Sequence, residues 1–209
     1  MSHKNYITSF CSIEAGKVSV NNDVDFSDAA ESPVDFLKLV YKHYQLNYPK
    51  FYKMDSLCKL AFVTSELLLR SSGIIEKYKS EDIAIVIANN VSSLEIDTEH
   101  QSTISDKNNY FPSPAVFVYT LPNILIGEIA IRNSIKGENT FFIFDKFDAD
   151  FMSSYIDSLL KSNKAQCCIA GWVDFYENKY RSFLYTVEKQ TGVLNTEHDS
   201  KQLNTLYKN

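Results

Sequence analysis

An uninterrupted apolar run, Ile83–Ala88 (IAIVIA), constrains the fold more than any other part of the sequence. A run of this length without a polar residue is typical of a strand whose two faces are both buried. Such strands belong to parallel or mixed sheets that helices cover on both sides. Thr140–Phe144 (TFFIF) and Gln166–Trp172 (QCCIAGW) have a similar character. The sequence therefore predicts a layered α/β protein with a buried sheet.

Helical and strand-like segments alternate along the rest of the chain. Apolar residues recur at helical spacing in residues 34–44, 55–71, 115–134 and 145–163. Further strands are predicted over residues 5–12, 17–20 and 180–187. Polar loops are predicted over residues 21–33 and 89–114, the second with a short helix. The order of these segments predicts a mixed sheet of about five strands with helices packed on its faces.

Helix boundaries can be read from capping residues. Asp55 or Ser56 is expected to cap the helix over residues 55–71, and Asp145, with Asp148 three residues on, the one over residues 145–163. The helix over residues 115–134 is expected to be buried, because it is rich in apolar residues and a bilayer would disfavour its Glu128. We therefore predict no membrane span.

The 209 residues are enough for one domain with a sizeable core. We predict a single domain over residues 1–189 and a mobile polar tail over residues 190–209. Glu197, His198 and Asp199 follow one another in that tail. Adjacent residues of a mobile segment do not face each other, so this triplet is not expected to form a catalytic group.

Charge and the N-terminal residues limit the classes of partner and the location. The formal net charge is −5, and no run of lysine or arginine could track a phosphate backbone, so nucleic acid is not an expected partner. Met1–Phe10 lacks the apolar segment of a signal peptide. The protein is therefore expected to be cytoplasmic.

The cysteines and histidines do not form a metal-binding pattern. No two of the four cysteines have CxxC spacing, and the four histidines are not spaced as pairs on one helix face. Cys167 and Cys168 are adjacent within an apolar run, as expected of core thiols in a reducing compartment. We expect neither a metal nor a cofactor.

Several motifs occur in the order used by one enzyme family. Their residues are Lys53-Met54-Asp55 with Lys59-Leu60-Ala61, IAIVIANN at 83–90, Ser113-Pro114, Leu121-Pro122-Asn123, Gly127, Ile131, Lys136-Gly137 and Asn139. This series resembles the N-terminal half of the β-ketoacyl synthases, members of the thiolase-like superfamily, in which a Lys-Gly-Pro-Asn turn leads into the nucleophile strand. It is also similar to half-length synthase-like proteins of Bacteroidetes aryl-polyene and flexirubin pathways. The resemblance implies a thiolase-like half fold.

The position that the resemblance assigns to the nucleophilic cysteine holds a lysine. In the family this cysteine lies nine residues after the turn glycine, which leads from Gly137 to Lys146. The usual separation of 25 residues from the Ala-Gly that closes the next strand, here Ala170-Gly171, also leads to Lys146. The small residues that follow the nucleophile are replaced by larger ones such as Phe147, so the pocket is expected to be filled or reshaped.

Lysine cannot replace the thiolate in acyl transfer, which needs a nucleophile at a helix N-terminus and an N–H directed at the oxyanion. The resemblance also places the family's two catalytic histidines in its C-terminal half, outside the matched region. A Lys146 with lowered pKa is disfavoured, because the nearby aspartates favour the charged amine. Whether the many aromatic residues line an acyl channel, a core or an interface is open.

Three functions are compatible with these observations. The first is a non-catalytic partner or regulatory subunit of a ketosynthase in fatty acid or polyketide-type biosynthesis, including polyene pigments. The second is a module that binds an acyl chain or an acyl carrier protein, and the third is a thioesterase or acyltransferase with displaced residues. In the family, the strand before the nucleophile pairs with its twin across a two-fold axis. A dimer with itself or a ketosynthase is thus expected through Thr140, Phe141, Phe142, Ile143 and Phe144.

Overall fold

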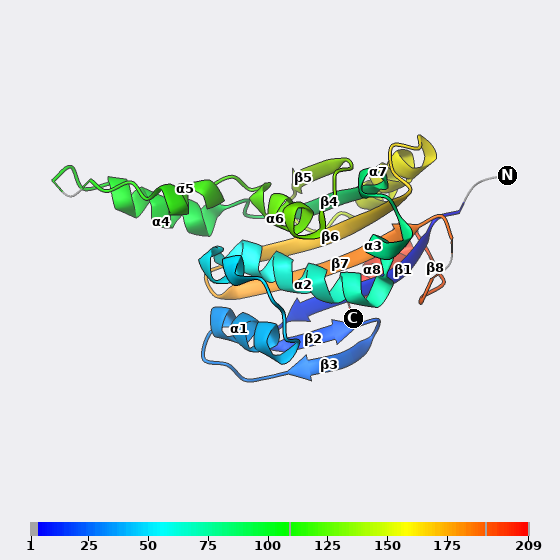
Figure 1. Ribbon diagram of the computed structural model, residues 1–209, viewed down its shortest axis with the longest axis horizontal. Helices are drawn as coiled ribbons and strands as arrows, with labels where there is room; N and C mark the ends of the chain where they lie inside the picture. The colour runs from blue at the N-terminus through cyan, green and yellow to red at the C-terminus, as the bar shows by residue number, and fades with distance from the viewer. Residues whose placement is uncertain (1–3, 109, 191, 209) are drawn as a thin grey trace.

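The computed structural model describes residues 4–108, 110–190 and 192–208, and its centre is one mixed sheet (Figure 1). The eight strands of the sheet are β1 (Tyr6–Glu14), β2 (Lys17–Val20), β3 (Asp23–Ser27), β4 (Ile83–Asn89), β5 (Asn139–Ile143), β6 (Cys167–Tyr176), β7 (Lys179–Glu188) and β8 (Thr196–Glu197). They are ordered β3-β2-β1-β7-β6-β4-β5, with β8 beside β1. The predicted α/β class and mixed sheet are confirmed, with more strands than expected.

Strand direction gives the sheet a defined carboxyl end. The strand β4 runs parallel to β5 and β6, whereas β7 pairs antiparallel with both β6 and β1. The strand β4 lies inside the parallel part, and all of its residues are buried, as its uninterrupted apolar sequence predicts. The strands β3 and β5 form the two edges.

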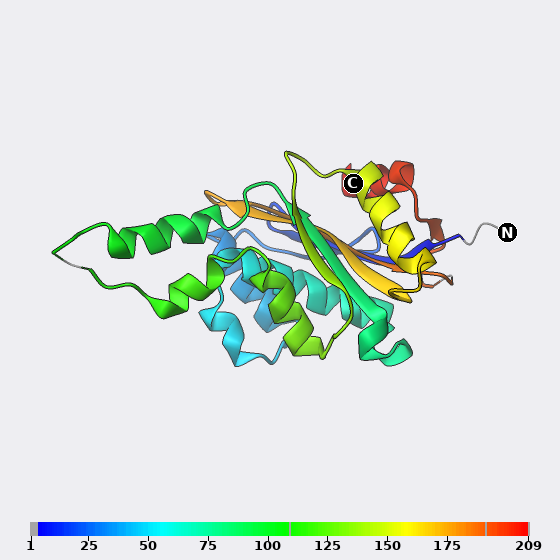
Figure 2. The same cartoon turned by 90° about the horizontal axis from the view of Figure 1, so that it is seen from above.

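Helices cover both faces of the sheet (Figure 2). They are α1 (Pro33–His43), α2 (Ser56–Ser72), α3 (Ile74–Lys77), α4 (Leu94–Ile104), α5 (Pro114–Tyr119), α6 (Ile124–Asn133), α7 (Ala149–Lys161) and α8 (Ser200–Lys208), with 3₁₀ helices η1 (Pro49–Lys53) and η2 (Ser80–Asp82). The core on one face contains residues of α1, α2 and α6, and the core on the other contains residues of α7 and α8. The helix α2 begins where predicted, because Asp55 Oδ1 accepts from Cys58 N at 3.0 Å.

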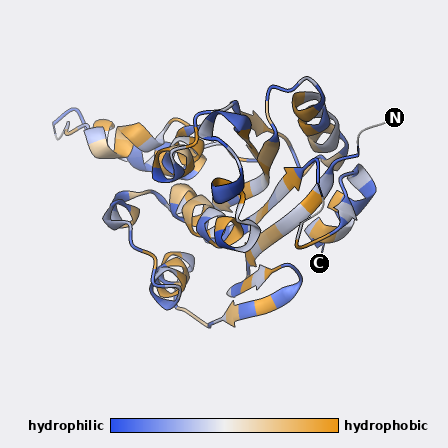
Figure 3. Cartoon of the chain, turned by 45° about the vertical axis from the view of Figure 1, so that its right-hand side comes forward, coloured by the Kyte–Doolittle hydropathy of each residue, from blue (hydrophilic) through white to orange (hydrophobic). Residues whose placement is uncertain are grey.

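The prediction of one buried helix over residues 115–134 is wrong. The chain instead forms α5 and α6, separated around Pro122, which has no N–H to donate and fits poorly inside a helix. Together with α4, α5 forms an arm that projects from the sheet (Figures 1 and 2). Several apolar side chains of the arm are exposed, among them Phe111 and Phe117. Figure 3 shows apolar segments on this arm as well as on the central strands.

Two segments predicted to lack regular structure contain strands or helices. Residues 23–27, in the predicted loop after β2, form β3 as the third strand of a meander. The predicted mobile tail contains β8, which pairs with β1, and α8, whose Leu203 is fully buried. The tail prediction is therefore wrong, because the apolar side of α8 packs on the sheet. None of the helices in the described part of the chain is long and apolar enough to cross a bilayer.

Candidate functional site

The largest cleft described lies at the carboxyl ends of the parallel strands. It has a volume of about 690 Å³ and is lined by residues from β1, β6, β7 and α8 and from the segments that follow β4 and β5. Ligands of open α/β sheets bind outside the carboxyl ends of the strands, and ligand sites commonly measure about 300–1,000 Å³. Its position and size make this cleft the candidate functional site.

Lys146 reaches this cleft from the bend between β5 and α7. Asn90, which follows β4, holds the bend by donating from Nδ2 to Phe144 O at 3.2 Å and to Asp145 O at 3.0 Å. The prediction that Asp145 caps the next helix is wrong, because the cap is Asp148, whose Oδ1 accepts from a first-turn amide at 2.9 Å. Lys146 is thus exposed and precedes α7 instead of lying in its first turn.

Three charged side chains across the cleft from Lys146 are already engaged. Asp174 Oδ1 accepts from the amides of Asn90 and Val91 at 3.1 and 3.4 Å, which ties the end of β6 to the end of β4. Arg181 on β7 forms an ion pair with Glu14, with 3.0 Å between Nε and Oε2. These carboxylates therefore position the strand ends and the guanidinium, and neither is bonded to Lys146.

Aromatic residues build the wall of the cleft next to α8. Phe147 stacks on Tyr207 with 4.4 Å between the ring centroids and meets Trp172 edge-on at 6.3 Å. The Arg181 guanidinium lies 4.0 Å above the Tyr207 ring and also donates to the Tyr207 carbonyl. Burial raises the pKa of Tyr207. The sequence analysis did not predict Tyr207 as a site residue, because the segment around it is mostly polar. It did not predict Arg181 either, because the sequence of one strand does not indicate which helix covers that strand.

The four cysteines are buried and none of them lines the described cleft. Cys167 and Cys168 begin β6 and therefore lie at the opposite end of the sheet from Lys146. Burial raises the pKa of both thiols, which disfavours the thiolate that a nucleophile requires. The prediction that these two residues are core thiols is confirmed.

His198 is buried and ordered, contrary to the prediction that it belongs to a mobile tail. Its Nδ1 lies 2.8 Å from Asp157 Oδ1, and Asn5 Nδ2 donates to the same oxygen at 2.7 Å. Burial raises the pKa of Asp157, but the hydrogen bonds from His198 and Asn5 outweigh it and hold this pKa below its ordinary value. The pair lies near the start of β1, so the structure does not bring it together with Lys146.

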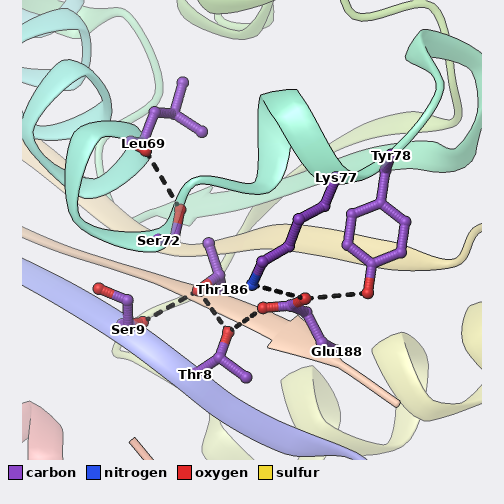
Figure 4. A network of polar contacts seen from close by, with 8 residues as sticks. All are labelled: Thr8, Ser9, Leu69, Ser72, Lys77, Tyr78, Thr186 and Glu188. Atoms are coloured by element: carbon purple, nitrogen blue, oxygen red, sulfur yellow. Dashed lines mark hydrogen bonds and ion pairs between the residues drawn. The ribbon is translucent and has the colours of Figure 1, made fainter. Parts of the chain in front are cut away.

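The buried carboxylate of Glu188, the last residue of β7, also lies at this end of the sheet, and Figure 4 shows its polar contacts. Its Oε1 accepts from Thr8 Oγ1 at 2.6 Å, and its Oε2 accepts from Tyr78 Oη at 2.9 Å and lies 3.5 Å from Lys77 Nζ. Thr186 extends the network through a hydroxyl contact of 3.0 Å with Thr8. Because both oxygens of Glu188 are engaged, we interpret this network as a structural link between α3, β1 and β7.

Among residues 4–108, 110–190 and 192–208, no group of three or more His, Cys, Asp or Glu side chains could hold a metal ion. The cleft itself combines an exposed amine, engaged carboxylates and an aromatic wall. This arrangement can bind a ligand or a peptide segment. Neither a thiol nor an imidazole is among the residues described as lining the cleft, although the exposed carboxylate of Asp145 is.

Comparison with known proteins identifies the fold. No family model and no curated protein matches the sequence. The solved structure of the ishigamide ketosynthase/chain length factor is 16% identical, with a TM-score of 0.66 over 88% of this chain and 62% of that chain. A ketosynthase (ApeO) in complex with its chain length factor (ApeC) from Xenorhabdus doucetiae is 14% identical, with a TM-score of 0.56 over 90% of this chain and 80% of that chain.

A third similar structure is the type II polyketide synthase complex AntDE:AntF, of an acyl-carrier protein with its ketosynthase bound to the hexaketide. It is 13% identical, with a TM-score of 0.59 over 88% of this chain. This chain spans 62% of the length of both the ishigamide and the AntDE:AntF chains. The predicted resemblance to ketosynthases is confirmed at the level of the thiolase-like fold.

Proposed function

We propose that this ketosynthase-like chain is a non-catalytic protein that acts as a partner or regulatory subunit of a ketosynthase in fatty acid or polyketide-type biosynthesis. The observation that carries the proposal is the composition of the cleft, where the lysine at the expected nucleophile position is exposed and the cysteines lie elsewhere in the core. The similar structures support it, since two of them are ketosynthases described with a chain length factor. We further propose that the pathway produces a polyene pigment. The protein would then act in the cytoplasm.

The contact strand in this proposal is β5, through Thr140–Phe144. The two edges of the sheet differ in charge, because β3 carries Asp23 and Asp25 whereas β5 carries no charged residue. Charged side chains protect an edge strand from pairing with another chain, and an uncharged apolar edge invites it. Ile143 of β5 is 53% exposed. A strand from a second copy or from a ketosynthase would cover this edge.

The cleft favours one alternative function. Its volume of about 690 Å³ is enough to hold part of an acyl chain or a carrier-protein segment without chemistry. A lipid or carrier protein that co-purifies with the protein, identified by mass spectrometry, would support this binding module. The third candidate, an acyl-transfer enzyme with displaced residues, is not favoured, because none of the described residues that line the cleft is a cysteine or a histidine. The Asp174 and Glu14 carboxylates are bonded to backbone amides and to Arg181.

Purified protein is expected neither to become acylated by acyl thioesters nor to release carbon dioxide from malonyl-carrier protein. The physical reason is that the described thiols are buried and Lys146 lacks a partner that would deprotonate it. Intact-mass spectrometry and a carbon dioxide assay would measure both reactions. Turnover above a control without protein would refute the proposed function.

Lys146→Cys is expected not to restore the reaction. Its side chain would lie in an exposed bend before α7, where the helix N-terminus does not stabilise a thiolate. The matched control is Lys164→Cys, which also places an exposed cysteine outside a helix. Both variants should acylate at the same slow rate, and selective acylation at position 146 would contradict this account.

A further inference from the structure

Two buried polar atoms of neighbouring side chains have no hydrogen-bond partner among the residues that the structure describes. They are Nε2 of His198 and Oη of Tyr185. The His198 side chain and the whole of Tyr185 are 0% exposed. A polar atom that leaves water on folding destabilises the protein unless it gains another partner. The two atoms therefore indicate an additional polar partner inside the protein.

The two rings come from distant parts of the sequence and pack against each other. Their centroids are 6.0 Å apart, and their planes are inclined by 37°. Tyr185 lies in β7 opposite Phe10 of β1, and His198 follows β8, which pairs with the start of β1. Because β1 pairs with both β7 and β8, it fixes the two rings relative to each other.

Asp157 determines which nitrogen of His198 carries the proton. Its Oδ1 lies 2.8 Å from His198 Nδ1 and accepts from Asn5 Nδ2 at 2.7 Å. Although burial raises the pKa of Asp157, these hydrogen bonds hold the pKa below its ordinary value. The carboxylate is therefore ionised at neutral pH and can only accept, so Nδ1 carries a proton. In the neutral imidazole ring, Nε2 is then a hydrogen-bond acceptor.

Tyr185 supplies the complementary group. Burial raises the pKa of Tyr185 well above its ordinary value, and the nearby Cys168 and Asp157 raise it further. The phenol therefore keeps its proton at neutral pH, and Oη has an O–H to donate. The donor and the acceptor do not bond to each other in this structure. A molecule between them must accept one hydrogen bond and donate another.

We propose that one enclosed water molecule accepts a hydrogen bond from Tyr185 Oη and donates one to His198 Nε2. Water combines the acceptor and the donor that the two atoms require. It is also small enough for a place where neither side chain is exposed. Buried waters typically make about two to four hydrogen bonds to polar atoms of this kind.

The water completes a hydrogen-bonded chain between four parts of the fold. The chain runs from Asn5, before β1, through Asp157 of α7 and His198 to Tyr185 of β7. His198 lies two residues before α8, the helix whose Tyr207 stacks on Phe147 in the wall of the cleft. The water thus ties the start of this helix to the sheet, which a polar segment with one fully buried leucine needs for its docking.

A crystal structure of the wild-type protein in which ordered waters are visible tests the site directly. We expect electron density for a water molecule within about 3.2 Å of both Tyr185 Oη and His198 Nε2. Density that is absent from this position would overturn the proposal, and so would a direct hydrogen bond between the two atoms.

Removing the Tyr185 hydroxyl tests the same site in solution. Tyr185→Phe is expected to increase the equilibrium constant for unfolding about tenfold, because the water loses one of its partners. If the hydroxyl had no partner, its removal would leave stability unchanged or increase it. Tyr52→Phe is the matched control and should have no effect, because Tyr52 is 53% exposed. A Tyr185→Phe protein at least as stable as the wild type in urea unfolding would overturn the proposal.

His198→Asn tests whether the two side chains share the water. The asparagine amide can still donate to Asp157 Oδ1, but it has no atom in the place of Nε2. In this background Tyr185→Phe should change the unfolding constant less than about twofold, since the shared water is already lost. Full and independent effects of the two substitutions would overturn the proposal. None of these outcomes concerns acyl transfer or β5, so the proposed function is tested separately.

Discussion

Replacing Gly171 with alanine is expected to leave little or no folded protein. Gly171 lies in β6 opposite Leu184 of β7 and has a φ of +148°, which side-chain-bearing residues rarely adopt. A Cβ atom there would lie 1.9 Å from Phe183 O and 2.9 Å from Leu184 Cα. Both atoms belong to the backbone of the central sheet and cannot move without breaking the ladder.

The expected loss for Gly171→Ala is more than about 4 kcal/mol, most of what a domain of this size has available. Urea unfolding or the soluble yield would measure it. Gly127→Ala is the matched control, because Gly127 lies within α6 and a Cβ atom there meets nothing within 4 Å. That change should stabilise the protein by up to about 1 kcal/mol. A Gly171→Ala protein as stable as the wild type would show that the β6–β7 pairing described here is wrong.

Removing residues 196–208 is expected to destabilise the protein by about 5 kcal/mol and to cause aggregation. These residues contribute β8, which pairs with β1, and α8, whose Leu203 and Tyr207 pack on the sheet face. Their loss exposes apolar residues of that face, including Phe183, together with the Phe147 ring on which Tyr207 stacks.

Point variants on α8 separate packing from chain length. Leu203→Ala should cost about 2–5 kcal/mol, because its side chain is fully buried. Lys201→Ala on the same helix should change stability by less than about 0.5 kcal/mol, because this residue is exposed. Unchanged urea unfolding after removal of residues 196–208 would mean that the segment is the mobile tail that its composition suggests.

Single segments with a strong local signal were predictable from the sequence. The strand β4 was predictable because its apolar run has no polar interruption, and the start of α2 because Asp55 has the side chain of a helix cap. The break at Pro122 was obscured by the apolar residues on both sides, although proline itself indicates it. In α8, Leu203, Leu206 and Tyr207 have helical spacing, but the surrounding polar residues hide it.

The cleft was predictable only in part. Counting along the chain leads to Lys146, which the structure places at the carboxyl end of the sheet beside β5. The prediction that Asp145 caps α7 was wrong, because aspartates also stand at positions 148 and 150. Which of them becomes the N-cap depends on where the chain turns into α7 and not on the residue type. The contact between Arg181 and Tyr207 joins a strand to a distant helix, and only the folded chain brings them together.

Sedimentation of the wild-type protein at micromolar concentration, alone and mixed with a ketosynthase, tests the central claim that the chain acts through pairing at β5. We expect twice the mass of one chain for the protein alone, or a complex with the ketosynthase in the mixture. Phe142→Lys should give monomers or insoluble protein, because it places a charge in the uncharged contact strand β5. A wild-type protein that sediments as a single chain both alone and with the ketosynthase would contradict the account.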